Sequence, residues 1–151
     1  MTTHVNSIKE LTALVGTHLG YSEYRPVTQE QVNLFADATG DHQWIHVDPE
    51  RAKTGPFGQT IAHGYLTLAL IPVLLGGVLK VDGVSMGVNY GTNKVRFTSP
   101  VPVGSLVRAG ATLASVDEVA GGVQVVLDVT VEVQGAPKPS CVAQVVFRYY
   151  E

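Results

Sequence analysis

The strongest constraint on the fold is the alternation of apolar and polar residues near the C-terminus. Apolar residues occupy every second position from Val123 to Val133, and polar residues such as Asp128 and Glu132 stand between them. A second run, from Cys141 to Tyr149, repeats this alternation. Because successive side chains of a strand point to opposite faces, each run predicts a strand with one buried and one solvated face.

Two further segments of the same half, 84–97 and 106–116, also have the pattern of strands. An interruption at Gly91-Thr92 divides the first, and a turn at Pro102-Val103-Gly104 precedes the second. The links between these four segments are too short for the crossovers that parallel strands need. They therefore predict an antiparallel sheet, to which an early strand within 17–27 is expected to add.

The first half of the chain has a helical period instead. Thr28 is expected to cap a helix, with Gln31 reaching back to it and Gly40 ending the helix. Asp48-Pro49-Glu50 predicts the start of a second, short helix that ends near Gly55-Pro56.

The segment from about Gly64 to Leu75 is apolar almost all round, which predicts a helix surrounded by other elements. Together with the strands, it predicts the fold class α+β. We expect one domain over residues 1–151, with an antiparallel β-sheet wrapped around a long central apolar helix.

Composition and charge limit the partners of the chain. A net charge of −3 and the lack of a Lys/Arg run argue against nucleic acid and against an anionic membrane surface. The apolar stretch 66–79 is shorter than the roughly 20 residues of a membrane span and contains Pro72. The first ten residues have neither a basic nor an apolar region, so we expect a cytoplasmic protein without a secretory signal. The single cysteine, Cys141, is expected to be a buried apolar residue.

Six residues between the two predicted helices, 41–46, fit neither period and form a candidate site on a loop. The carboxylate of Asp41 accepts hydrogen bonds at neutral pH, and the imidazole of His46 can give or take a proton, so together they can orient a water. Spacing alone leaves two alternatives open, in which Asp41 caps a turn and His46 is a buried, satisfied histidine. A metal site of His42, His46 and His63 is disfavoured, because these residues lack the usual pattern of zinc ligands.

The block from Phe35 to Pro49, followed by Ile61-Ala62-His63-Gly64, resembles the signature of the MaoC-like (R)-specific enoyl-CoA hydratases. That signature has an aspartate, a histidine five residues later, an Asp-Pro pair and a His-Gly pair. Residues 89–97 and 100–104 resemble a strand and a turn of the same family. The resemblance extends from about Val27 to Tyr149 and implies a hot-dog fold.

The resemblance implies that Asp41 and His46 are the catalytic pair and that the backbone amide of Gly64 faces the thioester carbonyl. Addition of water to a conjugated double bond places charge on that carbonyl oxygen, where a fixed donor lowers the barrier. A glycine that begins a helix offers an N–H group and lets the substrate approach closely. Gly64 has a second interpretation, in which it only allows tight packing.

Four further residues are expected to bind the substrate, namely Gln43, His63, Tyr65 and Arg96. His63 is also expected to orient the start of the helix. Arg96 and its neighbour Lys94 have two interpretations, contact with the phosphates of coenzyme A or a position on a solvated strand face.

The resemblance thus implies reversible hydration of trans-2-enoyl-CoA or enoyl-ACP to an (R)-3-hydroxyacyl thioester, with neither a cofactor nor a metal. The alternatives are a hot-dog acyl-CoA thioesterase and a non-catalytic module that binds acyl thioesters. A single curled sheet leaves exposed strand edges, so we expect a homodimer.

Overall fold

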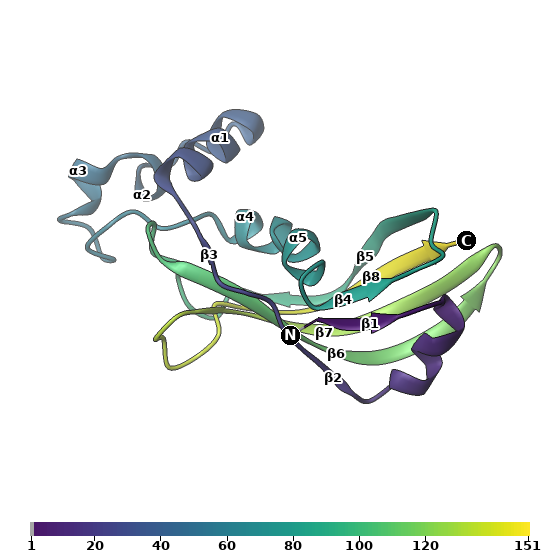
Figure 1. Cartoon of the computed structure of the whole chain (residues 1–151). Coiled ribbons are helices and arrows are strands. Elements are labelled where there is room, and N and C mark those ends of the chain that lie inside the picture. Colours follow the sequence, from purple (N-terminus) through teal and green to yellow (C-terminus); the bar gives the residue numbers. More distant parts are fainter. Residues whose placement is uncertain (1) are drawn as a thin grey trace.

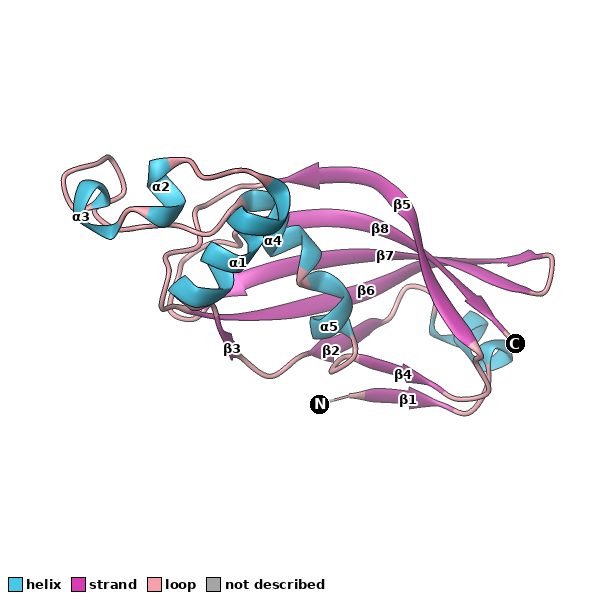
Figure 2. Ribbon diagram, turned by 90° about the horizontal axis from the view of Figure 1, so that it is seen from above, coloured by secondary structure: helices cyan, strands magenta, loops and turns pink. Residues whose placement is uncertain are grey.

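One antiparallel sheet dominates the structure, a computed structural model that describes residues 2–151. Five of its strands follow the spatial order β2-β6-β7-β8-β5, and β3 also pairs with β6. Figures 1 and 2 show these strands curving beneath the helices. The strands of this sheet are β2 (His18–Tyr21), β3 (Arg25–Pro26), β5 (Met86–Arg96), β6 (Leu106–Val119), β7 (Gly122–Val133) and β8 (Cys141–Tyr150).

Two short helices, α4 (Gly64–Ala69) and α5 (Ile71–Leu75), lie on one face of this sheet (Figure 2). This arrangement confirms the predicted α+β fold of the hot-dog type. The prediction of one long central helix was wrong, because α4 ends at Ala69, and α5 begins at Ile71 after the single residue Leu70. Pro72 has no N–H group to continue the ladder of helical hydrogen bonds, which explains the interruption.

The core lies between α4–α5 and the inner face of the sheet. The alternation predicted for β7 is confirmed, since the inward residues from Val125 to Val131 are at most 1% exposed. In β8 it holds from Cys141 to Val145 and is broken at Val146, which is 5% exposed. The inward residues of β7 pack in one cluster with Ile71 and Leu74 of α5. The central helices are not enclosed on all sides, however, because Tyr65 and Val73 are 71% and 51% exposed.

A segment made of α1 (Gln29–Thr39), α2 (Trp44–Val47) and α3 (Pro49–Ala52) projects from one end of the sheet (Figure 1). The Thr28 hydroxyl caps α1 by accepting from the N–H of Gln31, and Gly40 ends this helix at φ 86°. The reciprocal contact expected of the Gln31 side chain was wrong, since its Oε1 is buried without a partner among the described residues. The Asp48 carboxylate caps α3, as predicted.

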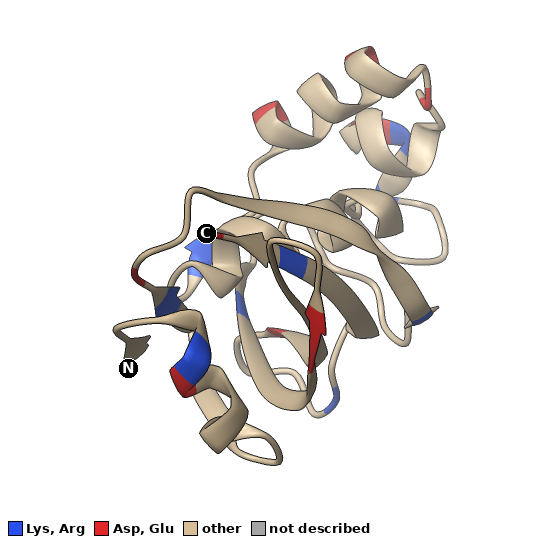
Figure 3. Cartoon of the chain, turned by 90° about the vertical axis from the view of Figure 1, so that its right-hand side faces the viewer, with Lys and Arg blue, Asp and Glu red and all other residues tan. Residues whose placement is uncertain are grey.

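The N-terminal elements were not predicted. β1 (Thr3–Val5) pairs in parallel with β4 (Leu79–Val81), and a 3-10 helix, η1 (Ile8–Leu14), joins β1 to β2. Within residues 2–151, no helix has the length and the hydropathy to cross a bilayer. Charged residues of both signs are spread over helices and strands (Figure 3).

Candidate active site

His46 lies on α2, a helix of four residues where the sequence predicted a loop. Its side chain is buried, and Nδ1 lies 2.7 Å from the carbonyl oxygen of Ile61. Because a carbonyl oxygen only accepts, Nδ1 carries the proton and Nε2 keeps its lone pair. A backbone hydrogen bond from Ile61 N to Ile45 O, 3.0 Å long, joins the same two segments. The imidazole is thereby held in one tautomer and one orientation.

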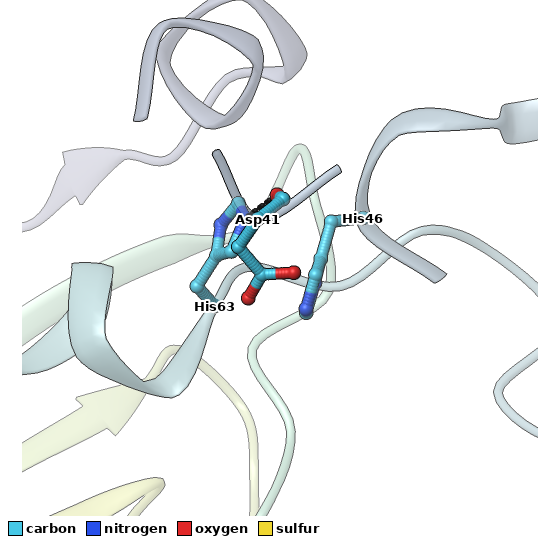
Figure 4. A group of neighbouring side chains, drawn as sticks. All are labelled: Asp41, His46 and His63. Carbon is cyan, nitrogen blue, oxygen red and sulfur yellow. Dashed lines mark hydrogen bonds between the residues drawn. The ribbon is translucent and has the colours of Figure 1, made fainter. Parts of the chain in front are cut away.

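Asp41 follows Gly40, whose left-handed conformation turns the chain out of α1. The N–H of Gln43 donates to Asp41 Oδ1 over 3.4 Å, which is the turn-capping role considered from the sequence. This bond is long, and the carboxylate also extends toward His46 (Figure 4). Capping and catalysis are therefore compatible at this residue.

His63 packs behind the pair. Its Nε2 donates to the backbone carbonyl of Asp41 over 3.0 Å, and its ring stacks on His46 with centroids 3.9 Å apart (Figure 4). Its other face meets Phe35 at 4.8 Å, and the side chain is 2% exposed. It precedes α4 but makes no side-chain cap to that helix. His63 thus contacts both Asp41 and His46, which sequence spacing did not reveal.

Asp41, His46 and His63 each offer one possible metal ligand, and these atoms lie within 4.8 Å of one another. Nε2 of His63 carries the proton in its bond to Asp41, whereas Nδ1 keeps a lone pair and is buried without a hydrogen-bond partner among the described residues. One carboxylate and two imidazoles can orient a water molecule, and they are also ligand types that zinc accepts, so the metal-free site stays a prediction. His42, the third ligand considered from the sequence, lies instead on the surface, where its hydrogen bond to Asp37 raises its pKa.

Gly64 begins α4 beside a pocket of about 340 Å³. A Cβ atom built on Gly64 would lie only 2.7 Å from Cδ2 of Phe97, so this ring packs directly against the glycine. Phe97 also meets Tyr65 edge to face, with centroids 5.8 Å apart. The pocket is lined by Phe57, Ile61, Ala62, Gly64, Thr67, Phe97, Thr98, Ser99, Pro100, Val101 and Ser140. Asp41 and His46 do not line this pocket. Ile61 does line it, and its backbone carbonyl accepts the hydrogen bond from the His46 ring.

The remaining predicted site residues lie outside the cluster. Gln43 is exposed at the start of α2, and only its backbone N–H contacts Asp41 in the described chain. Tyr65 projects toward solvent. Arg96 is exposed on β5 and donates to the carbonyl of Val95 rather than to the cluster, and Lys94 is exposed as well.

Sequence reasoning missed the residues that hold the pair in place. Ile61 accepts from the His46 ring, while Gln29 contacts both the His46 carbonyl and Thr60. These bonds join residues 15, 17 and 31 positions apart, so no local pattern marks them. The sequence placed Phe97 at the end of a predicted strand that resembles the family, but it did not predict the contact of Phe97 with Gly64.

Comparison with known proteins identifies the family. Residues 10–135 match the family model described as a MaoC like domain. The chain is 57% identical over 144 residues to 3-hydroxyacyl-thioester dehydratase Z of Mycobacterium tuberculosis, covering 95% of each chain. It is 45% identical over 143 residues to nodulation protein N of Rhizobium meliloti, covering 93% of this chain and 89% of that one.

A solved structure agrees with this relationship. The (R)-hydratase from A. caviae involved in PHA biosynthesis superimposes with a TM-score of 0.72 and 26% identity, covering 88% of this chain and 94% of that one. The family model spans most of the chain, and the fold and the sequence relatives agree with it. The chain therefore belongs to the family of MaoC-like domain proteins.

Proposed function

We propose that this chain catalyses the reversible addition of water to trans-2-enoyl thioesters, giving (R)-3-hydroxyacyl thioesters. The observation that carries the proposal is the pairing of the Asp41 carboxylate with a His46 ring whose Nδ1 is bonded to Ile61. That bond leaves Nε2 as a base. The relative named 3-hydroxyacyl-thioester dehydratase Z supports the reaction class, since dehydration is the reverse of this hydration.

The chemistry follows from these groups. Asp41 accepts one hydrogen bond from the water, and Nε2 of His46 takes a proton as the water oxygen bonds to the β-carbon of the enoyl group. The electrons of the double bond move toward the thioester oxygen, where the N–H of Gly64 stabilises the developing charge. Return of a proton from the Asp41–His46 pair to the α-carbon completes the addition.

The space for the substrate lies along α4. The pocket beside Gly64 would receive the thioester carbonyl, and a second groove of about 310 Å³ runs between α4–α5 and β5. Leu68, Ile71, Val145 and Phe147 give this groove the apolar lining that an acyl chain needs. We assign Gln43, His63, Tyr65 and Arg96 to substrate binding as a prediction, with either coenzyme A or acyl carrier protein as the carrier. A cytoplasmic location likewise stays a prediction.

The test is hydration of crotonyl-CoA, followed by loss of the enoyl absorbance. Asp41→Asn and His46→Gln should each lower kcat by at least about 100-fold, as expected for loss of a group that moves the proton. Asp37→Asn and His42→Gln are matched controls, because these residues form an exposed pair of the same chemical types beside the site. Full activity in both dyad variants would contradict the assignment.

One observation favours the binding module as a second candidate. Asp41 and His46 are absent from the lining of the Gly64 pocket, so a ligand could occupy that pocket without touching the pair. Binding of crotonyl-CoA without turnover by the wild-type chain would support this candidate. Release of free coenzyme A would instead indicate the thioesterase.

We also propose that two copies associate through β5. This strand pairs with β8 along one edge, and its 11 residues are exposed at nearly every position. Met86, Val88 and Tyr90 of this strand are 53%, 38% and 59% exposed. An unpaired edge with apolar side chains favours pairing with a second copy.

Light scattering tests this association. The wild-type chain should have twice the mass of the 16.1 kDa protomer, and Val88→Lys should shift it toward one protomer. Val15→Lys places the same charge at another exposed valine, away from β5, and should leave the dimer intact. A wild-type monomer at working concentration would contradict the proposal.

A further inference from the structure

A side chain outside the expected site holds the peptide group of His46. Gln29, the first residue of α1, has its carboxamide between the His46 carbonyl and the Thr60 side chain. Its Nε2 donates to His46 O over 2.8 Å, and its Oε1 accepts from Thr60 Oγ1 over 2.7 Å. Because the His46 carbonyl only accepts, the amide nitrogen has to face it, which fixes the orientation of the carboxamide.

The partners of Gln29 are themselves anchored. Thr60 is 5% exposed, and its carbonyl accepts from the N–H of Val103 over 3.0 Å. The next residue, Ile61, accepts from the ring of His46. Gln29 therefore ties the His46 main chain to the same segment that orients the His46 ring.

His46 is thus held at two points by one buried segment, Thr60-Ile61. The Ile61 carbonyl sets the rotation of the ring, and Gln29 sets the position of the peptide from which the ring extends. α2 has only four residues, too few to fix its own position by helical hydrogen bonds. The direction of Nε2 consequently depends on contacts from outside α2.

We propose that Gln29 is a positioning residue for the hydration reaction, acting through the main chain of His46 on the direction of Nε2. The proposal rests on the function proposed above. Gln29 bonds to protein groups and not to reacting atoms, so its loss should affect kcat more than KM. A displacement of about 1 Å at a reacting group can cost about 100-fold in rate. We expect losses of about 10-fold to 100-fold in kcat, with KM within about twofold.

Two substitutions separate the contacts of Gln29. Gln29→Glu keeps the shape and an oxygen for Thr60, but it places an acceptor against the His46 carbonyl. Gln29→Met removes all polar contacts at similar length. Asn33→Ala is the control, because Asn33 is exposed and its bond to Gln29, 2.9 Å long, does not reach His46. Its kcat should stay within about twofold of wild type, since an exposed hydrogen bond contributes little.

The Thr60 hydroxyl supplies a milder variant for the case that Gln29 substitutions prevent folding. Thr60→Val removes the donor to Gln29 Oε1 while keeping the shape, and Thr60→Ser keeps the hydroxyl. We expect kcat to fall in Thr60→Val and to be restored in Thr60→Ser. Equal kcat in these two variants and the wild type would overturn the proposal.

Nitrogen NMR of the His46 ring adds a readout that needs no turnover. The wild type should show one tautomer, protonated at Nδ1, and Gln29→Met should shift the ring signals, because movement of the His46 peptide changes the geometry of the Nδ1–Ile61 bond. Folded Gln29 variants with wild-type kcat would overturn the proposal, as would a rise in KM that equals the fall in kcat. An inactive wild type would refute the hydratase function instead, and unchanged ring signals in Gln29→Met would then overturn the role of Gln29.

Discussion

Replacement of Gly64 by alanine tests whether the start of α4 serves the substrate or only packing. The backbone of Gly64 does not have the positive φ that disfavours alanine, and the substitution keeps the N–H group. The added methyl group would lie 2.7 Å from Cδ2 and 2.9 Å from both Cε2 and Cγ of Phe97. Carbon atoms normally approach to about 3.5–4.0 Å, so the Phe97 ring has to move by roughly 1 Å.

Stability and activity should respond differently to this change. Overpacking typically costs about 1–3 kcal/mol, and Phe97 is 45% exposed, so its ring can move outward at the lower end of that range. The methyl group and the displaced ring both lie where the substrate would approach the Gly64 amide. Obstruction that keeps the thioester carbonyl from the Gly64 N–H should cost as much as loss of one oxyanion donor, about 2.7–4 kcal/mol, which corresponds to a fall of roughly 100-fold to 1,000-fold in kcat.

The assay combines crotonyl-CoA hydration with thermal unfolding. Gly77→Ala is the control, because a Cβ atom there meets neighbours at 3.4 Å or more, outside the site. Gly64→Ala combined with Phe97→Leu should recover stability, and it should recover activity to the extent that the ring causes the obstruction. Because Gly64→Ala keeps its N–H group, a kcat within about threefold of wild type would refute the expected obstruction of the substrate by the methyl group and the Phe97 ring.

Three further predictions concern the scaffold. Thr28→Ala removes the cap of α1, whose bond to Gln31 N is 3.1 Å long, and should lower the free energy of unfolding by about 1 kcal/mol in a urea titration; an unchanged midpoint would contradict the cap. Burial raises the pKa of Cys141 to about 11, so its thiol should resist a disulfide reagent at about pH 8 until the chain unfolds, and rapid labelling of the folded chain would contradict this. The bond to Asp37 raises the pKa of His42, so its stabilisation is present below the unfolded pKa of about 6.5 while Asp37 is ionised, and it is lost as pH rises through the folded pKa. His42→Gln should therefore lower the melting temperature more at about pH 5.5 than at about pH 8.5, and equal effects at both would refute the pairing.

Elements with a strong local pattern were predicted correctly. β7 and the first half of β8 alternate because one face of each strand is buried, and α1 carries its own signals at Thr28 and Gly40. Both kinds of signal are properties of neighbouring residues, so they are visible in the sequence.

Short elements and interruptions were less predictable. α2 has four residues and is anchored by Ile61 and Gln29, which are distant in the sequence. The pairing of β1 with β4 joins residues about 76 positions apart, and it depends on tertiary contact rather than on local pattern. Pro72 was visible in the sequence, but the apolar character of its surroundings suggested one continuous helix.

The residues of the candidate site show the same difference between local signals and long-range contacts. Asp41, His46 and Gly64 were predicted because a family resemblance marked them, while spacing alone left their roles open. The contacts around these residues were not predicted. His63 bonds to Asp41, which is 22 positions away, and Phe97, which directly follows β5, packs against Gly64. Such contacts exist only after the chain has folded.

The most direct test of the proposed function is the configuration of the product formed from crotonyl-CoA by the wild-type chain. Separation on a chiral column should show (R)-3-hydroxybutyryl-CoA, with intact thioester and no free coenzyme A, and Asp41→Asn should form almost none. Formation of the (S) product, or release of coenzyme A without a hydroxyacyl thioester, would contradict the proposal that Asp41 and His46 add water to the double bond.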